Sequence, residues 1–266
     1  MYADYNEVKK VLTKFPKYLK ILGKSVWGKN IYALVKGKGG IIVQAGMHAR
    51  EHVTTKVLLY LLQYRAILSE FRDIAIIPLV NPDGVDLCLH GATAFKNAEW
   101  LRIVNGSDDF SMWKANANAV DINVNFDALW GQGKSNVDYP SPTGYVGKTP
   151  ESETETKTLV HFTREYRAKY SVSLHAKGEE IYSGFLGIDK DPALSKKFAS
   201  AVGYPLKETE GSVGGYKDWC VFKLGISGYT VEIGNDKKSY LELYDDVKEL
   251  ADRVYKGLLV LRDYER

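Results

Sequence analysis

Short runs of apolar residues alternate along this chain with longer segments whose apolar residues recur at helical spacing, and this alternation limits the fold most strongly. Short apolar runs with polar or glycine-rich flanks are typical of buried strands. The strands expected on this basis are Ile31–Val35, Gly40–Ala45, Ile74–Val80, Tyr170–Leu174 and Gly228–Ile233. Strands interleaved with helices predict an α/β layered domain.

Helical patterns lie between and after these strands. The helices expected are His52–Leu68, a helix opening at Ser152 and ending near Lys169, Asp191–Ala201, and Asp245–Arg262. Ser152 and Glu155 have the spacing of a capping box. The last helix carries a stripe that is expected to face the core, made of Val247, Leu250, Val254, Leu258 and Leu261. Residues 91–147 are rich in Asn, Gly, Ser and Asp, and so long an irregular segment is usually functional.

Length and composition exclude several classes of protein. The chain has 266 residues without repeats or long linkers, so we expect residues 1–266 to form one catalytic domain. Its net charge, 36 − 33 = +3, is too small to predict nucleic-acid binding.

No continuous apolar run is long enough for a signal peptide or a membrane span. We therefore expect a cytoplasmic protein, or an extracellular or cell-wall protein if a leader has been removed. Cys88 and Cys220 are expected to be free thiols. The oligomeric state is not indicated.

Polar residues follow four of the expected strands directly. His48 and Glu51 come after the strand that ends at Ala45, and the segment 81–84 (NPDG) follows the strand that ends at Val80. His175 follows Leu174, and Glu232 lies at the end of the last strand. Because ligands bind at the carboxyl ends of strands in open α/β sheets, we expect these four segments to build one site.

Two histidines and one glutamate are the ligands of a catalytic zinc site, in which a fourth position stays open. His48, Glu51 and His175 provide this set. The zinc polarises a carbonyl and acidifies water, and a further carboxylate must accept the proton. Glu232 is the candidate for that general base. The alternative for these residues is a polar network without a metal.

Five segments of the chain together resemble the zinc carboxypeptidases of the pancreatic carboxypeptidase A type. These segments are GMHAREHVTTK, NPDG, WKANANAVDINVNF, SLHAKG and GGYKDWCVFKLGISGYTVEIG, in that order. The resemblance extends from about Tyr5 to the last helix. It implies a single α/β domain with a mixed, mostly parallel eight-stranded sheet and helices on both faces.

The resemblance also implies roles for individual residues. His48, Glu51 and His175 match the ligands of one zinc ion, Glu232 matches the general base, and Asp121 matches a carboxylate that hydrogen-bonds the first zinc histidine.

Three cations are expected to act on the substrate. Arg50 matches an arginine that contacts substrate. Lys114 follows Met112-Trp113, where the family carries the arginine that polarises the scissile carbonyl. We expect Lys114 to keep that role, with Arg102 as the alternative.

The chain departs from the family where the family binds a C-terminal carboxylate. The Asn-Arg pair of the family is Asn123-Val124 here, and valine cannot make the bidentate contact. The tyrosine eight residues before Asp218 is replaced by Glu210. Lys217 occupies the position that lines the specificity pocket and favours an anionic side chain.

Further substrate contacts are expected around this pocket. Glu210 and Glu179 are the expected partners of an amine, and Tyr182 and Tyr216 are expected to line the cleft. A side chain with both a carboxylate and an amine is that of diaminopimelate.

The GGYKDW and WKAN segments resemble the branch of the family that cuts between γ-D-glutamate and a diamino acid. We therefore expect a zinc peptidase that acts on γ-D-glutamyl-meso-diaminopimelate bonds of murein peptides. One alternative is a conventional carboxypeptidase with an altered carboxylate clamp that prefers acidic terminal residues. The other is an inactive module that binds cell-wall peptides.

Overall fold

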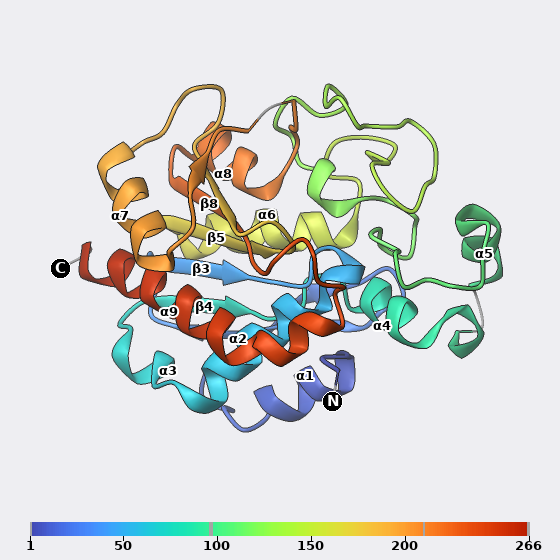
Figure 1. The fold of residues 1–266 in the computed structure, drawn as a ribbon. Helices are drawn as coiled ribbons and strands as arrows, with labels where there is room; N and C mark the ends of the chain where they lie inside the picture. Colours follow the sequence, from blue (N-terminus) through green and yellow to red (C-terminus); the bar gives the residue numbers. More distant parts are fainter. Residues whose placement is uncertain (1, 96–97, 210, 265–266) are drawn as a thin grey trace.

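An eight-stranded sheet forms the centre of the computed structural model, which describes residues 2–95, 98–209 and 211–264 (Figure 1). The strands are β1 (Leu19–Lys24), β2 (Asn30–Lys36), β3 (Ile41–Gln44), β4 (Ile74–Ile77), β5 (Tyr170–His175), β6 (Glu180–Ser183), β7 (Leu206–Lys207) and β8 (Ser227–Glu232). Their order across the sheet is β1-β2-β4-β3-β5-β8-β6-β7. The central pairs β4/β3, β3/β5 and β5/β8 are parallel, as is β6/β7, and the other pairs are antiparallel. The expected mixed, mostly parallel sheet is confirmed.

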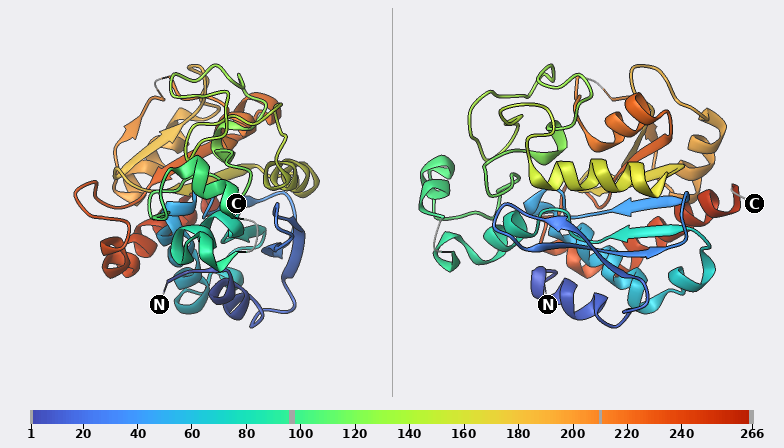
Figure 2. Two further views of the ribbon diagram at one scale, coloured as in Figure 1. Left: turned by 90° about the vertical axis from the view of Figure 1, so that its right-hand side faces the viewer. Right: turned by 180° about the vertical axis from the view of Figure 1, so that it is seen from behind.

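Helices cover both faces of the sheet. The α-helices of the described residues are α1 (Tyr5–Leu12), α2 (His52–Tyr64), α3 (Ile67–Glu70), α4 (Pro82–His90), α5 (Glu99–Asn105), α6 (Thr154–Tyr166), α7 (Pro192–Val202), α8 (Tyr216–Leu224) and α9 (Val247–Tyr264). Short 3₁₀ helices are η1 (Ala49–Glu51), η2 (Ala92–Ala94), η3 (Ile122–Val124) and η4 (Glu242–Asp246). Helices α2 and α9 lie in front of the sheet in Figure 1, and α6 lies over the opposite face in the right-hand view of Figure 2.

The alternation of side chains along each strand divides the core between these two layers. Ile41 and Val43 of β3 pack in the core on the side of α2 and α9, whereas Ile42 packs on the side of α6 and α8. All three residues are fully buried. A strand that is covered on both faces must be apolar throughout, which explains the continuous run in the sequence.

The five strands expected from the apolar runs are β2, β3, β4, β5 and β8, with ends that differ by at most three residues. The pattern did not predict β1, β6 or β7. β1 is a partly exposed edge strand with lysines at Lys20 and Lys24, and β7 has only two residues. Lysines on an edge strand prevent pairing with other chains, but they also weaken the apolar signal.

Two expectations for the helices were wrong in detail. The pattern His52–Leu68 is broken at Arg65, whose backbone is extended, so α2 ends at Tyr64 and α3 follows. No capping box opens α6, because the carboxylate of Glu155 accepts a hydrogen bond from the Val26 amide (3.1 Å) instead.

The remaining helices follow the sequence more closely. Asp191 caps α7 by accepting from the Leu194 amide, and all five residues of the expected stripe on α9 are buried. Each fully buried leucine of that stripe contributes about 1.5–3 kcal/mol through the apolar area that it removes from water.

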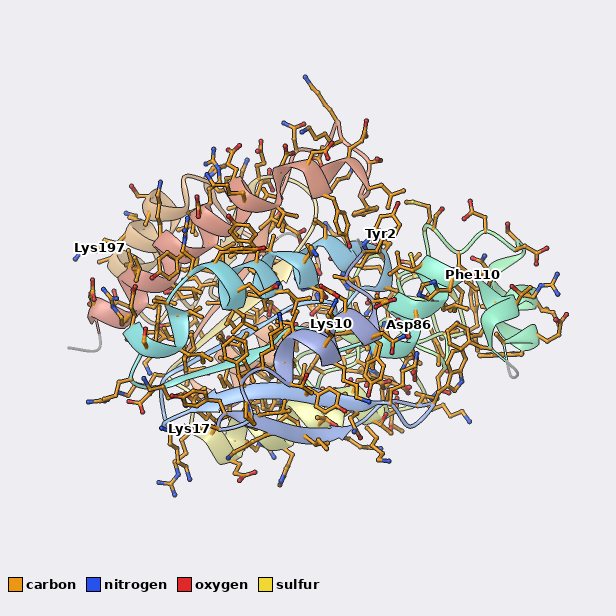
Figure 3. All side chains as sticks on the ribbon, turned by 90° about the horizontal axis from the view of Figure 1, so that it is seen from below. Tyr2, Lys10, Lys17, Asp86, Phe110 and Lys197 are labelled. Carbon is orange, nitrogen blue, oxygen red and sulfur yellow. The ribbon has the colours of Figure 1, made fainter. Side chains whose placement is uncertain are left out.

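The surface carries mainly polar and charged side chains, and Lys17 and Lys197 point outward in Figure 3. Cys88 and Cys220 are free thiols, as expected. Across the described ranges, we find no helix with both the length and the apolar character needed to cross a membrane.

Candidate active site

The turn after β3 positions His48 and Glu51. His48 precedes η1, and Glu51 ends this single helical turn, so their three-residue spacing directs both side chains to one centre. The Ala49 amide donates to the Lys114 carbonyl (3.1 Å) and the Arg50 amide donates to the Trp113 carbonyl (2.9 Å). These hydrogen bonds attach the turn to the long irregular segment and fix its position.

His175 joins this pair from the end of β5. Its Nδ1 lies 3.0 Å from Glu51 Oε2 and 3.0 Å from His48 Nδ1, and His48 Nδ1 lies 2.9 Å from Glu51 Oε1. All three side chains are buried, and their ligand atoms lie within 4.8 Å of one another. The expectation that these residues gather around one centre is confirmed.

The donor set fits a divalent cation. His48 Nε2 faces Asp121 Oδ1 at 3.2 Å, and we assign the imidazole proton to Nε2 on this basis, which leaves the Nδ1 lone pair toward the centre. A hydrogen bond to a carboxylate on the far side of a metal-binding histidine is the usual arrangement in proteins. Two imidazole nitrogens and one carboxylate are the donors that zinc prefers, with further positions left open.

Asp121 connects the histidine to a lysine. Its Oδ2 lies 2.9 Å from Lys114 Nζ and accepts from the Gly144 amide (3.1 Å). Burial disfavours the charged carboxylate, but Lys114 and His48 outweigh this effect and hold the pKa of Asp121 well below its ordinary value. Burial also opposes the charge on Lys114, yet Asp121 and Glu51 raise the pKa of its ammonium. Asp121 and Lys114 therefore both stay ionised.

Glu51 follows the same balance. Burial alone would raise the pKa of the Glu51 carboxyl. The opposing effect of His48 and His175 is larger, so the pKa is lowered and the carboxyl stays ionised. The Ala176 amide also donates to Glu51 Oε2 (3.2 Å). An ionised carboxylate is the form that coordinates a metal.

Glu232 lies beside this centre at the end of β8. It is the register partner of His175, and the Ile233 amide donates to the His175 carbonyl (2.8 Å). Burial raises the pKa of Glu232 to about 7; among its neighbours, His175 lowers this pKa and the Glu51 carboxylate raises it. Its side chain still lines a pocket, so a ligand can reach it.

The NPDG segment does not bring a side chain to the centre, and this part of the expected convergence was wrong. Asn81 caps α4 and donates from Nδ2 to the carbonyls of Met47 (3.2 Å) and Ala115 (3.0 Å). Asp83 is buried elsewhere and accepts from the Trp27 amide (2.7 Å). The segment therefore supports the backbone on both sides of the site.

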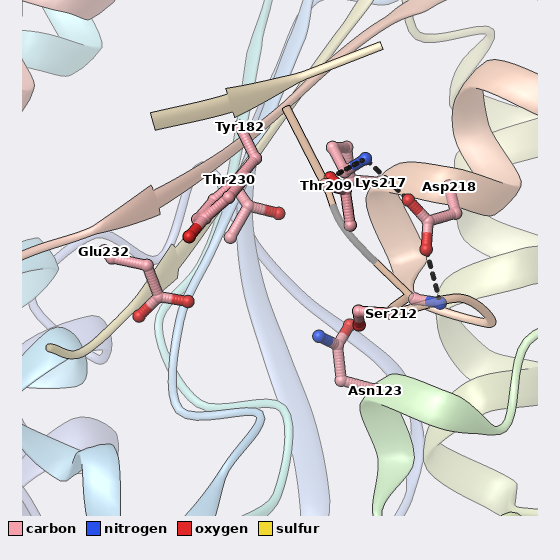
Figure 4. Close-up of a pocket in the computed structure, with 9 residues that line it drawn as sticks. Asn123, Tyr182, Thr209, Ser212, Lys217, Asp218, Thr230 and Glu232 are labelled. Atoms are coloured by element: carbon pink, nitrogen blue, oxygen red, sulfur yellow. Dashed lines mark hydrogen bonds and ion pairs between the residues drawn. The ribbon is translucent and has the colours of Figure 1, made fainter. Parts of the chain in front are cut away.

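A pocket of about 230 Å³ extends from Glu232 (Figure 4). Of the residues expected to contact substrate, Asn123, Tyr182 and Lys217 line it. Lys217 is 5% exposed and its Nζ lies 2.6 Å from Asp218 Oδ1.

Tyr216 does not line this pocket, which corrects the expectation. Its ring is fully buried beside Phe126 and Trp219, and its hydroxyl lies 2.7 Å from Thr163 Oγ1. Successive residues of a helix point about 100° apart, so Lys217 reaches the pocket while Tyr216 faces the core.

Arg102 is not brought to the centre. It pairs with Glu99 and Asp108 on the exposed side of α5, at the edge of the molecule in Figure 1. Of the two cations considered for the scissile carbonyl, only Lys114 contacts the ligand network.

The other residues that were expected to contact substrate are Arg50, Glu179 and Glu210. Arg50 lies next to the ligand turn, with its guanidinium over the Tyr240 ring at 5.7 Å. Glu179 accepts from Asn235 Nδ2 (3.3 Å) near the surface and does not line the pocket. Glu210 lies outside the described residues.

Sequence reasoning missed several residues of the pocket. Thr209, Ser212, Asp218 and Thr230 all line it. Asp218 and Thr230 had a usable signal, because they stand next to Lys217 and two positions before Glu232 in the sequence. Thr209 and Ser212 had a similar signal, because they stand one position before and two positions after Glu210, which was expected to contact substrate.

Comparison with known proteins agrees with this geometry. The family model described as zinc carboxypeptidase matches residues 5–254. "Gamma-D-glutamyl-L-diamino acid endopeptidase 1" of Lysinibacillus sphaericus is 30% identical over 254 residues, covering 86% of this chain and 64% of that protein. "Uncharacterized protein YqgT" of Bacillus subtilis (strain 168) is 32% identical over 263 residues, covering 87% of this chain and 69% of that protein. The chain thus spans about two thirds of the length of these relatives.

Solved structures share the fold. Bovine thrombin-activatable fibrinolysis inhibitor, in complex with tick carboxypeptidase inhibitor, aligns with a TM-score of 0.79 at 21% identity, over 99% of this chain and 97% of that one. The murein-tripeptide amidase MpaA of Escherichia coli O157 aligns with a TM-score of 0.63 at 23% identity, over 93% of each chain.

Proposed function

The chain belongs to the zinc carboxypeptidase family, and we propose that it hydrolyses the amide bond between γ-D-glutamate and meso-diaminopimelate in bacterial cell-wall peptides. The family and the ligand geometry make it a zinc metallopeptidase with one zinc ion at His48, Glu51 and His175. The substrate is proposed from the L. sphaericus relative, whose name specifies a γ-D-glutamyl-L-diamino acid bond.

The observation that carries this proposal is the composition of the pocket beside Glu232. Lys217 provides a cation there, and the residue after Asn123 is the neutral Val124. Valine cannot bind a terminal carboxylate in the bidentate manner of arginine. A pocket without that arginine, but with a buried lysine, suits a polar side chain better than an ordinary C-terminal residue.

The bound zinc supplies Lewis acidity at the scissile carbonyl and at the attacking water. Glu232 accepts the proton of that water and delivers it to the leaving amine. A carboxyl whose pKa is about 7 exchanges protons in both directions near neutral pH, as a general base that becomes a general acid must.

Asp121 and Lys114 support this chemistry in different ways. Asp121 holds the proton on His48 Nε2, so that Nδ1 keeps its lone pair for the metal. Lys114 places a fixed positive charge next to the centre, where negative charge develops on the carbonyl oxygen. Arg50, beside the ligand turn, is proposed to contact the part of the substrate on the acyl side.

The test is the release of diaminopimelate from L-Ala-γ-D-Glu-meso-diaminopimelate by the zinc-loaded protein, followed by chromatography. Peptides with ordinary C-terminal residues, including glutamate, serve as competing substrates. We expect diaminopimelate to be released at least a hundredfold faster than any of these, and Glu232→Gln to reduce turnover by several orders of magnitude.

Two outcomes would replace the proposal. Faster release of C-terminal glutamate than of diaminopimelate would indicate the conventional carboxypeptidase with an altered clamp. Binding of the tripeptide without turnover, and with equal affinity in Glu232→Gln, would indicate a binding module.

A further inference from the structure

The positive charge of this chain is concentrated in its first forty residues. They contain nine lysines, no arginine and two acidic residues, which gives a net charge of 9 − 2 = +7. The remaining residues contain 36 − 9 = 27 basic and 33 − 2 = 31 acidic side chains, a net charge of 27 − 31 = −4. The overall charge of +3 therefore conceals a strongly basic part of the chain, which forms α1, β1 and β2.

Five cations lie at one end of the sheet, which we call the basic end. They are Lys14 and Lys17 in the turn between α1 and β1, Lys20 in β1, Lys38 in the turn between β2 and β3, and Arg167 at the C-terminus of α6. The Val35 amide donates to the Tyr18 carbonyl (2.8 Å) and joins the end of β2 to the start of β1. The Gly39 amide donates to the Tyr166 carbonyl (2.8 Å) and joins the next turn to the end of α6.

The five side chains are exposed, and none of them forms an ion pair with a carboxylate of the described residues. Lys17 points away from the molecule in Figure 3. Asp73 lies at this end too, but its carboxylate is occupied by Arg72 (2.5 Å) and the Lys38 amide (3.0 Å). Protection of the edge strand accounts for Lys20, but it does not account for the cations in the turns. The basic end therefore carries positive charge that the protein does not use.

The basic end lies away from the catalytic pocket. Lys38 precedes β3 and Arg167 precedes β5, so both stand at the N-terminal ends of two parallel strands. His48 follows β3 and His175 ends β5, so the metal ligands stand at the opposite ends of the same strands. A ligand at the basic end therefore leaves the pocket open to substrate.

The cations follow the edge of the sheet from one of its faces to the other. Lys14 and Lys17 come after α1, which packs in the core on the side of α2, whereas Arg167 ends α6 on the opposite face. Lys20 is the register partner of Ala33, whose side chain packs on the side of α6. A flexible chain can follow such a curved band, whereas a flat membrane surface contacts only part of it.

The chemistry of this surface favours phosphate. A lysine ammonium is a compact point charge that binds phosphate without the planar recognition of arginine. Among residues 3–40, all of which the structure describes, Ile21 is the one large apolar side chain that is exposed. The surface formed by these residues thus offers neither an apolar face for a membrane nor exposed rings for the bases of a nucleic acid.

We propose that the basic end binds a flexible phosphodiester polymer without bases, such as a chain of glycerol phosphate units. Each phosphodiester carries one negative charge, which pairs with one of the five cations. Binding at this end holds the protein on an anionic matrix while the pocket stays free for substrate. The inference does not depend on which amide bond the protein cleaves.

The experiment measures the affinity of the zinc-loaded protein for a fluorescently labelled poly(glycerol phosphate) oligomer by fluorescence anisotropy at several salt concentrations. Release of counterions lowers log K by about 0.7 per log unit of salt for each phosphate that is neutralised on a flexible strand. Five contacts give a slope of about −3.5, so we expect affinity to fall about a hundredfold between about 50 and 200 mM salt.

Two matched variants each remove four positive charges. The test variant combines Lys14→Gln, Lys17→Gln, Lys20→Gln and Lys38→Gln. The control variant combines four exposed lysines of other segments, Lys148→Gln, Lys196→Gln, Lys237→Gln and Lys248→Gln. Because one contact remains in the test variant, we expect its slope to fall to about −1 and its affinity at low salt to fall at least tenfold. The control variant should bind within threefold of the parent protein. Both variants should keep the Tm of the parent, because surface substitutions of this kind change stability little.

Vesicles that contain phosphatidylglycerol and a single-stranded oligonucleotide are titrated in parallel. Weaker binding of both, per phosphate, supports the inference. Binding of either one that equals or exceeds that of the polymer overturns it, and assigns the surface to a membrane or to a nucleic acid. An affinity for the polymer that does not depend on salt, or a test variant that binds like the control variant, also overturns it.

Discussion

Substitution of Gly46, which lies between β3 and His48, tests whether close packing behind the ligand turn fixes the position of the metal centre. Its φ is +62°, and a Cβ added there would lie 2.5 Å from Thr55 Oγ1 and 2.7 Å from Leu79 Cδ1. Gly225, at the C-terminus of α8, has the same φ of +62°, but a Cβ added there would have no atom within 4 Å. Gly46→Ala and Gly225→Ala therefore share the backbone cost and differ in crowding.

The expected magnitudes follow from these two terms. A left-handed backbone costs an L-residue about 1–2 kcal/mol, and the reduced freedom of the unfolded chain returns about 0.4–1 kcal/mol. Gly225→Ala should thus lower the free energy of unfolding by about 1 kcal/mol. Gly46→Ala adds overpacking of about 1–3 kcal/mol, for a total of about 2–4 kcal/mol.

Urea unfolding of the metal-free proteins measures these differences, and a competition assay with a chelating dye measures zinc affinity. We expect Gly46→Ala to bind zinc more weakly, because relief of the crowding moves His48, while Gly225→Ala binds zinc like the parent protein. Equal unfolding free energies for the two variants, within about 0.5 kcal/mol, would refute the reasoning.

Three further predictions concern metal, charge and pH. Zinc at a thousand times its Kd should stabilise the protein by about 4 kcal/mol, seen as a concentration-dependent rise in Tm that is absent in His175→Ala. Lys114→Met leaves the Asp121 carboxylate, 1% exposed, without its ammonium, and should cost about 3–5 kcal/mol in urea unfolding; a cost below about 1 kcal/mol would contradict the buried pair. Burial raises the pKa of Glu155 from 4.5 to about 7, so the folded state binds this proton more tightly and loses stability as pH rises from about 4.5 to 7. Glu155→Gln should therefore gain on the parent protein between pH 5 and pH 8, by at most about 3 kcal/mol, and parallel stability curves across that range would exclude the shift.

Features that depend on the local pattern of residues could be predicted from the sequence alone. Strand β3 was legible because a strand covered on both faces must be apolar at every position. His48, Glu51 and His175 were legible because each follows a buried strand, and parallel strands end at the same edge of the sheet. The edge strand β1 could not be predicted in this way, because its residues are partly exposed and need not be apolar at every position.

Only the tertiary structure showed where individual side chains point and which residues they contact. Tyr216 and Lys217 are neighbours on one helix, yet the packing of α8 sends the first into the core and the second into the pocket. Lys114 and Arg102 both lie in the segment 91–147, which was expected to be irregular, but Arg102 belongs to α5, and only the folded chain brings Lys114 to Asp121. Residue types and local spacing determine which groups are available for catalysis. Contacts between segments far apart in sequence determine which of them meet, because the burial and the partners of a side chain depend on what packs against it.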